Sequence, residues 1–152
     1  MALDTVDNIN TLARILQSEA SVGNASEQTA VGWTVLNRMM RNRTEQVSVV
    51  AGAYSTRQPP TAVTLELAKN LLKGNISDPT KGATHFYSPR RMPKDGQATA
   101  GFDVGGGLEL VPPLMEKNYR PSWAASFLPV IVSGTRPHVY KFYRATGAGP
   151  VF

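Results

Sequence analysis

The chain has 152 residues, which is enough for one domain with a core of its own. Hydrophobic residues make up 41% and charged residues 18%, a balance typical of globular and not of disordered proteins. Cysteine is absent, which excludes disulfides, cysteine nucleophiles and cysteine-ligated metals, while the formal charge of +5 favours anionic partners such as nucleic acid, membrane surfaces or wall polymers.

Residues 4–20 carry apolar side chains at helical spacing and end at Glu19 and Ala20, before a loop at 21–25. Glu19 lies on the flank of the apolar stripe. A carboxylate at such a junction can be partly desolvated and still face a cleft, and this raises its pKa. We therefore predict that Glu19 is a catalytic acid, whereas the alternative is a solvated glutamate at a helix end.

The second predicted helix, residues 27–41, is apolar on nearly every side, which is typical of a buried central helix that holds Trp33 in the core. Asn24 or Ser26 can cap it, and Glu27 stands three residues after Asn24, as in a capping box. We therefore interpret Glu27 as a capping residue and not as a second catalytic acid.

The segment 44–60 ends in a double proline and is predicted to be irregular, so it could line a groove. A third helix is predicted over 62–73, with Thr61 as its cap and Gly74 as its stop. Together these patterns predict an α+β fold that is mainly helical.

Beyond the helices, the chain reads as turns and short strands. Asp78-Pro79 is a turn signal, so we expect the Asp78 side chain to stabilise a turn. Aromatic and β-branched residues predict strands at 84–87 and 138–144. Between them we expect a long Gly-rich loop at 90–107 and a short helical turn within 108–120.

His85 and His138 are the two histidines of the chain, and each stands in an aromatic, strand-like context. A zinc site would need a third ligand and an open position, and no third ligand is evident. We therefore expect hydrogen-bonded strand histidines and no metal or cofactor. Tyr87 and Tyr140 project from the same predicted strands and are candidates to orient Glu19 or the substrate.

Three blocks of this sequence resemble the SleB-like cell-wall hydrolases. The first block is Glu19-Ala20, Gln28-x-Ala30-Val31 and Val35-Leu36-Asn37-Arg38; the second is Asp78-Pro79-Thr80-x-Gly82-Ala83-Thr84-His85-Phe86-Tyr87-Ser88-Pro89; the third is the stretch from Gly134 to Tyr143, with His138 and Phe142. The resemblance spans roughly residues 12 to 144. It departs at Gly23, where family members usually carry a second glutamate, and the loop at 90–107 looks inserted.

The resemblance implies a single lysozyme-like domain over residues 1–152, with a small antiparallel sheet. It implies peptidoglycan as the substrate, cleaved between N-acetylmuramic acid and N-acetylglucosamine, commonly by lytic transglycosylation. Glu19 is then the catalytic residue. We take Tyr87, His85, Tyr140 and His138 as the candidate substrate-binding residues, with no cofactor and no metal.

Two other functions stay open from the sequence. A lysozyme-like domain could be a non-enzymatic structural or wall-binding protein of a phage particle. Nucleic-acid binding would rest on cationic side chains without a recognised motif. These are Arg38, Arg41, Arg43, Arg90, Arg91 and Lys94.

The first residues have neither the basic region nor the apolar run of a signal peptide, and no stretch approaches transmembrane length. We therefore expect a protein that is made in the cytoplasm and does not insert into a membrane. It would act on the wall after release at lysis, or as part of a virion in association with tail or other virion proteins.

Overall fold

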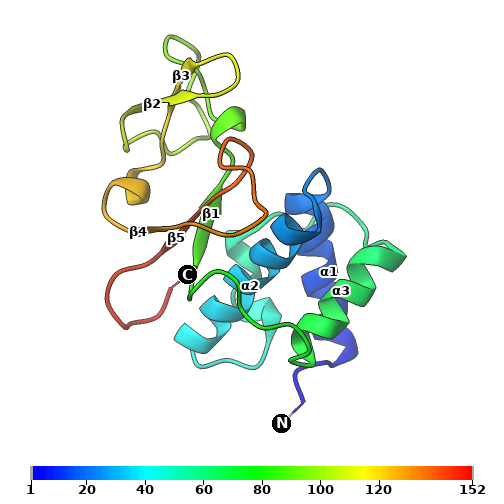
Figure 1. The fold of residues 1–152 in the computed structure, drawn as a ribbon. Helices are drawn as coiled ribbons and strands as arrows, with labels where there is room; N and C mark the ends of the chain where they lie inside the picture. Colours follow the sequence, from blue (N-terminus) through cyan, green and yellow to red (C-terminus); the bar gives the residue numbers. More distant parts are fainter. Residues whose placement is uncertain (1, 152) are drawn as a thin grey trace.

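A computed structural model describes residues 2–151. Its helices are α1 (Val6–Ala20), α2 (Ala25–Arg41) and α3 (Ala62–Leu72), which gather into one lobe below the strands in Figure 1. Two short 3₁₀ turns, η1 (Val47–Val49) and η2 (Ala51–Ala53), lie in the segment between α2 and α3. The prediction of a mainly helical α+β fold is confirmed.

Side-chain caps fix where the helices begin. Thr5 accepts a hydrogen bond from the backbone of Asn8 at the start of α1 (3.2 Å). Asn24 and Glu27 form the predicted capping box at the start of α2, and Thr61 caps α3 together with Thr64. These bonds satisfy amide groups that have no partner inside the helix, so the cap residues set the boundaries.

The core of the helical lobe lies between α1, α2 and α3. Fully or almost fully buried apolar side chains fill it, among them Leu12, Leu16, Val31, Val35 and Leu71. Gly32 lets α2 and α3 approach closely, because a Cβ added there would lie only 2.5 Å from Leu71 Cδ1.

A three-stranded antiparallel sheet stands beside this lobe, in the order β1 (His85–Tyr87), β5 (Lys141–Arg144), β4 (Leu128–Val130). The prediction of a strand over 138–144 was wrong for its first half. The backbone amides of Val139 and Tyr140 both donate to the carbonyl of Arg136 (2.9 Å each), so a turn precedes β5.

A second antiparallel pair, β2 (Leu108–Val111) and β3 (Glu116–Tyr119), projects at the far end of the molecule from the helices (Figure 1). The predicted helical turn in 108–120 was therefore wrong. Pro112 to Met115 form the turn of a hairpin, with Met115 at a φ of 54°. Part of the loop 90–107 is tied to this hairpin, because Asp95 N–H donates to the Lys117 carbonyl (2.8 Å).

No helix within residues 2–151 is both long enough and apolar enough to cross a membrane.

Candidate active site

The end of α1 faces β1 across a cavity of about 290 Å³, which we call the Glu19 cavity. It is lined by residues from four parts of the chain. They are Ser18, Glu19 and Val22; Phe86, Tyr87, Ser88, Arg91 and Met92; Phe102; and Val139 and Tyr140. The cavity therefore brings together Glu19, Tyr87 and Tyr140, three of the residues that the sequence singled out.

The Glu19 side chain is half-buried, and one of its oxygens accepts a hydrogen bond from the backbone N–H of Ser55 (2.9 Å). Burial raises the pKa of Glu19 above its ordinary value, and the Ser55 N–H and the charge of Arg91 only partly offset this. A carboxyl that stays protonated to higher pH is suited to donate a proton in catalysis.

Tyr140 fixes the backbone at Glu19. Its hydroxyl donates to the carbonyl oxygen of Glu19 (3.1 Å), and its ring lies among the aromatic side chains of Phe86 and Phe142, with centroids 6.0 and 6.4 Å away. Tyr140 is only 3% exposed, and its hydrogen bond to Glu19 is partly buried. Tyr140 thus holds the end of α1 in place and does not contact the Glu19 carboxylate.

Tyr87 lines the Glu19 cavity, but its hydroxyl points elsewhere. It donates to both carboxylate oxygens of Glu109 in β2 (2.9 and 3.0 Å), and Lys141 Nζ lies 3.1 Å from the same carboxylate. Burial raises the pKa of Tyr87 far above its ordinary value. Its hydroxyl therefore ties the hairpin to the central sheet and does not reach Glu19.

His85 lies outside the lining of the Glu19 cavity. Its ring packs against Trp123 and Phe127, with centroids 4.9 and 4.8 Å away, and its Nδ1 forms a hydrogen bond with Thr84 Oγ1 (2.9 Å). Burial, with the charges of Arg38 and Arg41, lowers the pKa of His85 to about 4. The expectation of a hydrogen-bonded strand histidine is confirmed for His85.

His138 also lies outside the lining, in the turn before β5, where its carbonyl accepts the backbone N–H of Arg90 (3.1 Å). It is therefore not a strand residue, contrary to the prediction. Within residues 2–151 no three His, Cys, Asp or Glu side chains gather as a metal site would require.

The other acidic side chains near the motif blocks have structural roles. Glu27 is fully buried and is bonded to Asn24 and Arg136. Asp78 accepts the backbone N–H groups of Thr80 (2.7 Å) and Gly82 (3.0 Å), which confirms its predicted role in a turn. Among the described residues that line the Glu19 cavity, Glu19 is the only carboxylate.

The position of Gly23, where the resemblance would place a second glutamate, is crowded. A Cβ added there would lie 3.1 Å from the Cβ of Glu27 and 3.3 Å from Cε2 of Tyr140. A longer side chain would therefore require the neighbouring residues to move.

Two motif residues of α2 place β1 opposite Glu19. Asn37 Nδ2 donates to Asp78 Oδ2 (3.0 Å) and to the carbonyl of Ala83 (2.9 Å), and Arg38 Nε donates to the carbonyl of Thr84 (2.6 Å). The guanidinium of Arg38 also lies 5.1 Å from the ring centroid of Tyr54. The first two sequence blocks are thus joined physically, and together they form two walls of one site.

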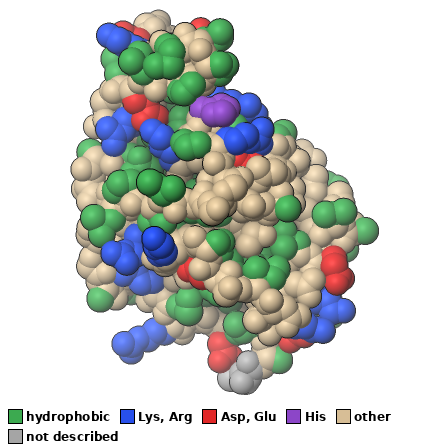
Figure 2. All heavy atoms as spheres, in the orientation of Figure 1, with side chains coloured by type: hydrophobic (Ala, Val, Ile, Leu, Met, Phe, Trp, Pro, Cys, Tyr) green, Lys and Arg blue, Asp and Glu red, His purple; other side chains and the backbone are tan. Residues whose placement is uncertain are grey.

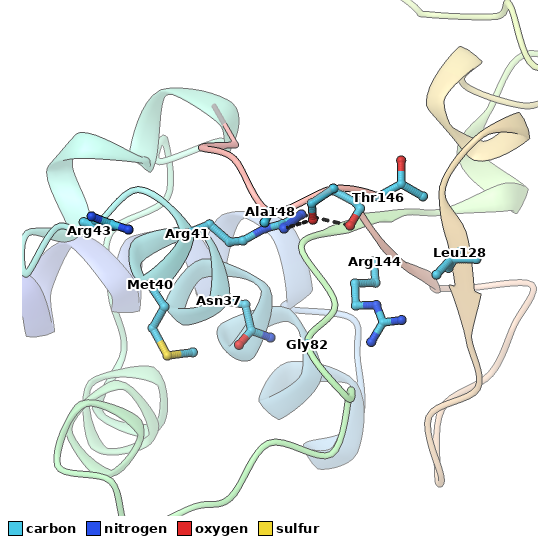
Figure 3. Close-up of a pocket in the computed structure, with 11 residues that line it drawn as sticks. Asn37, Met40, Arg41, Arg43, Gly82, Leu128, Arg144, Thr146 and Ala148 are labelled. Carbon is cyan, nitrogen blue, oxygen red and sulfur yellow. Dashed lines mark hydrogen bonds between the residues drawn. The ribbon is translucent and has the colours of Figure 1, made fainter.

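The first three cationic residues considered for nucleic-acid binding differ in their surroundings. Arg38 is buried in the core. Arg41 donates to the carbonyls of Ala145 and Gly147, beside a second pocket of about 670 Å³, and there the Arg43 side chain points away from Arg144 (Figure 3). On the face drawn in Figure 2, basic side chains stand in several separate groups.

Three features of the site were missed from the sequence: the Ser55 N–H, Arg91 and Phe102. A backbone N–H leaves no trace in a sequence pattern, and Arg91 was counted only as part of a basic set. Phe102 is an isolated aromatic residue within a Gly-rich loop, and it was the one available signal.

In this arrangement, Glu19 can donate a proton to a polar substrate that lies between the aromatic side chains of the cavity. Comparison of the chain with protein-family models, with curated proteins and with solved structures gave no match.

Proposed function

We propose that this protein is a peptidoglycan glycosidase that cleaves the β-1,4 bond between N-acetylmuramic acid and N-acetylglucosamine, as a lytic transglycosylase. The observation that carries the proposal is the state of Glu19. It is a half-buried carboxyl with a raised pKa, and no second carboxylate stands among the described residues that line its cavity.

A single acid suits transglycosylation. Glycoside hydrolysis usually needs a second carboxylate, which acts as nucleophile or as base. In the first step, Glu19 gives its proton to the glycosidic oxygen while the bond from that oxygen to C1 breaks. The N-acetyl group of the muramic acid stabilises the positive charge that develops at C1. In the second step, the Glu19 carboxylate removes the proton of the C6 hydroxyl, whose oxygen bonds to C1. The acid is thereby restored, and the product carries a 1,6-anhydro ring.

The surroundings of Glu19 fit both steps. Ser55 N–H holds one carboxyl oxygen, and Tyr140 anchors the Glu19 backbone, so the acid keeps its position as it loses and regains a proton. Phe86, Met92 and Val139 give the cavity apolar walls. Such walls limit the access of water and favour attack by the internal hydroxyl over hydrolysis.

The choice of peptidoglycan as substrate rests on the resemblance to the SleB-like hydrolases. The contacts of Asn37 and Arg38 with the segment 78–84 give that resemblance a physical meaning, since they connect its first and second blocks. The family glutamate corresponds to Glu19, which lines the cavity opposite β1.

The test is the release of soluble fragments from purified, dye-labelled peptidoglycan by the wild type, Glu19→Gln and Glu66→Gln. Glu66 is an exposed glutamate of α3 and serves as the matched control. We expect release by the wild type and by Glu66→Gln, and none above background by Glu19→Gln. Binding to peptidoglycan without release by any of the three proteins would contradict the proposal and would favour the non-enzymatic, wall-binding alternative.

A further inference from the structure

Arg91 occupies a fixed position at the Glu19 cavity. It is the last residue of the 3₁₀ turn η3 (Pro89–Arg91), which follows β1 almost directly. The turn is held from both sides, because Arg90 N–H donates to the His138 carbonyl (3.1 Å) and Asn118 Nδ2 donates to the Pro89 carbonyl (3.0 Å). The Arg91 side chain therefore starts from an anchored backbone.

The Arg91 guanidinium has no protein partner within residues 2–151: it makes no hydrogen bond there and has no carboxylate within 4.0 Å. Several exposed arginines share this lack of a partner, but among the described residues Arg91 is the only arginine that lines the Glu19 cavity. Some of the other arginines are bonded to the protein. Arg38, Arg120 and Arg136 donate to carbonyl or carboxylate oxygens. Arg91 is exposed and lines the cavity, so its hydrogen-bonding groups are free for a ligand.

A cation at this place works against the acid. The charge of Arg91 lowers the pKa of Glu19, whereas a proton donor benefits from a raised one. Its presence beside Glu19 therefore points to a role in binding. A guanidinium presents paired N–H groups that match the two oxygens of a carboxylate.

In the substrate of the proposed function, the sugar rings are uncharged. Carboxylates occur on the lactyl substituent of the muramic acid, next to the scissile bond, either as the free lactyl acid or within an attached stem peptide. On the basis of the proposed function, we propose that Arg91 binds a carboxylate carried by this substituent and thereby selects for muramic acid.

The experiment measures the binding of disaccharides of N-acetylglucosamine β-1,4-linked to N-acetylmuramic acid, which lack the bond that the proposed reaction cleaves. Three forms are compared by calorimetry: the free lactyl acid, its neutral N-methylamide, and the form with a stem tripeptide. The proteins are the wild type, Arg91→Gln and Arg90→Gln. Arg90 is the exposed neighbour in the same turn, outside the lining, and provides the matched control.

We expect Arg91→Gln to weaken binding of at least one charged form by about tenfold or more, because a charge-assisted contact is lost. Binding of the neutral amide should stay unchanged, and Arg90→Gln should resemble the wild type throughout. The charged form that is affected identifies the source of the carboxylate. Equal loss for the charged forms and the neutral amide, or no loss for any form, would overturn the role of Arg91. The absence of binding of every disaccharide by the wild type would instead count against the proposed function.

Discussion

The end of α1 and the first turn of α2 hold two glutamates in contrasting surroundings. Glu19 is half-buried, receives one hydrogen bond from Ser55 N–H, and has a raised pKa. Glu27 is 0% exposed. Burial alone would raise its pKa, but hydrogen bonds from Arg136 and from the backbone hold that pKa below the ordinary value.

The difference shows that partners, and not burial alone, decide what a carboxylate can do. The Glu27 carboxylate accepts hydrogen bonds from the backbone N–H and the guanidinium of Arg136 (2.8 and 2.7 Å). Glu27 therefore loses its proton at a lower pH than an ordinary glutamate, and it connects α2 to the segment that contains Arg136. Glu19 has no cation in contact within the described residues, and it faces a cavity. Of these two glutamates, only Glu19 lines the cavity.

Glu19→Gln should produce the largest effect on activity. Loss of a general acid typically lowers the rate by about 10²- to 10⁴-fold. The unfolding free energy at neutral pH should stay the same or rise, since the substitution removes a half-buried charge. Initial rates of peptidoglycan cleavage check the effect on activity, and urea unfolding of the same preparations checks the effect on stability. A loss of both rate and stability would contradict the contrast between Glu19 and Glu27.

Glu27→Gln should give the reverse pattern. Loss of the charged bonds to Arg136 and the backbone should lower the unfolding free energy by about 2–3 kcal/mol and the Tm by about 4–12 °C. The rate per folded molecule should change much less than in Glu19→Gln. Thermal unfolding followed by circular dichroism measures the shift, with the exposed Glu45→Gln as the control that should leave Tm unchanged.

Tyr140→Phe tests how the backbone of Glu19 is held. Removal of the hydroxyl leaves the Glu19 carbonyl without its bond from Tyr140, at a cost of about 1 kcal/mol in unfolding free energy. We expect a loss of activity of about tenfold, since a displaced acid meets the substrate less well. An unchanged rate would show that this bond serves only the fold.

The two glutamates should also change stability with pH in opposite senses. The pKa of Glu19 is raised on folding, so its contribution is fully present below the ordinary value of 4.5 and is lost as pH rises through the folded pKa. The pKa of Glu27 is lowered, so its contribution is present above 4.5 and is lost as pH falls through the folded pKa.

Urea unfolding of the wild type, Glu19→Gln and Glu27→Gln from about pH 3 to about pH 8 measures these contributions. The wild type should lose stability relative to Glu19→Gln as pH rises. The advantage of the wild type over Glu27→Gln should shrink on acidification. If both stability differences changed in the same direction as pH rises, the contrast between Glu19 and Glu27 would be wrong.

The helices could be predicted because their signals are local. Apolar spacing and the caps Asn24 and Thr61 depend on residues close in sequence, and the structure places both caps as expected. The hairpin of β2 and β3 was missed, because Pro112 and the glycines before it do not show the pattern of a strand, and the contacts that hold the hairpin join residues far apart in the sequence, such as Tyr87 and Glu109. Tyr140 was assigned to a strand because its alternating neighbours continue the pattern of β5 into a turn.

The candidate site could be predicted only in part. Glu19 was found because it lies beside an apolar stripe at a helix end, and Tyr140 because it is an aromatic residue near a strand. The Ser55 N–H and Arg91 come from irregular segments whose place is fixed by long-range packing, which no local pattern encodes. The bond from the Tyr87 hydroxyl to Glu109 could not be predicted for the same reason, because β2 lies far from β1 in the sequence.

The most direct test of the central claim, that Glu19 acts as a single acid and base, is mass spectrometry of the fragments released from purified peptidoglycan by the wild type and by Glu19→Gln. The account predicts 1,6-anhydro-muramic acid ends from the wild type and none from the variant. Reducing muramic acid ends from the wild type would contradict it, because a water molecule and not the C6 hydroxyl would then have attacked C1. Release of anhydro fragments by Glu19→Gln at the wild-type rate would contradict the assignment of Glu19 itself.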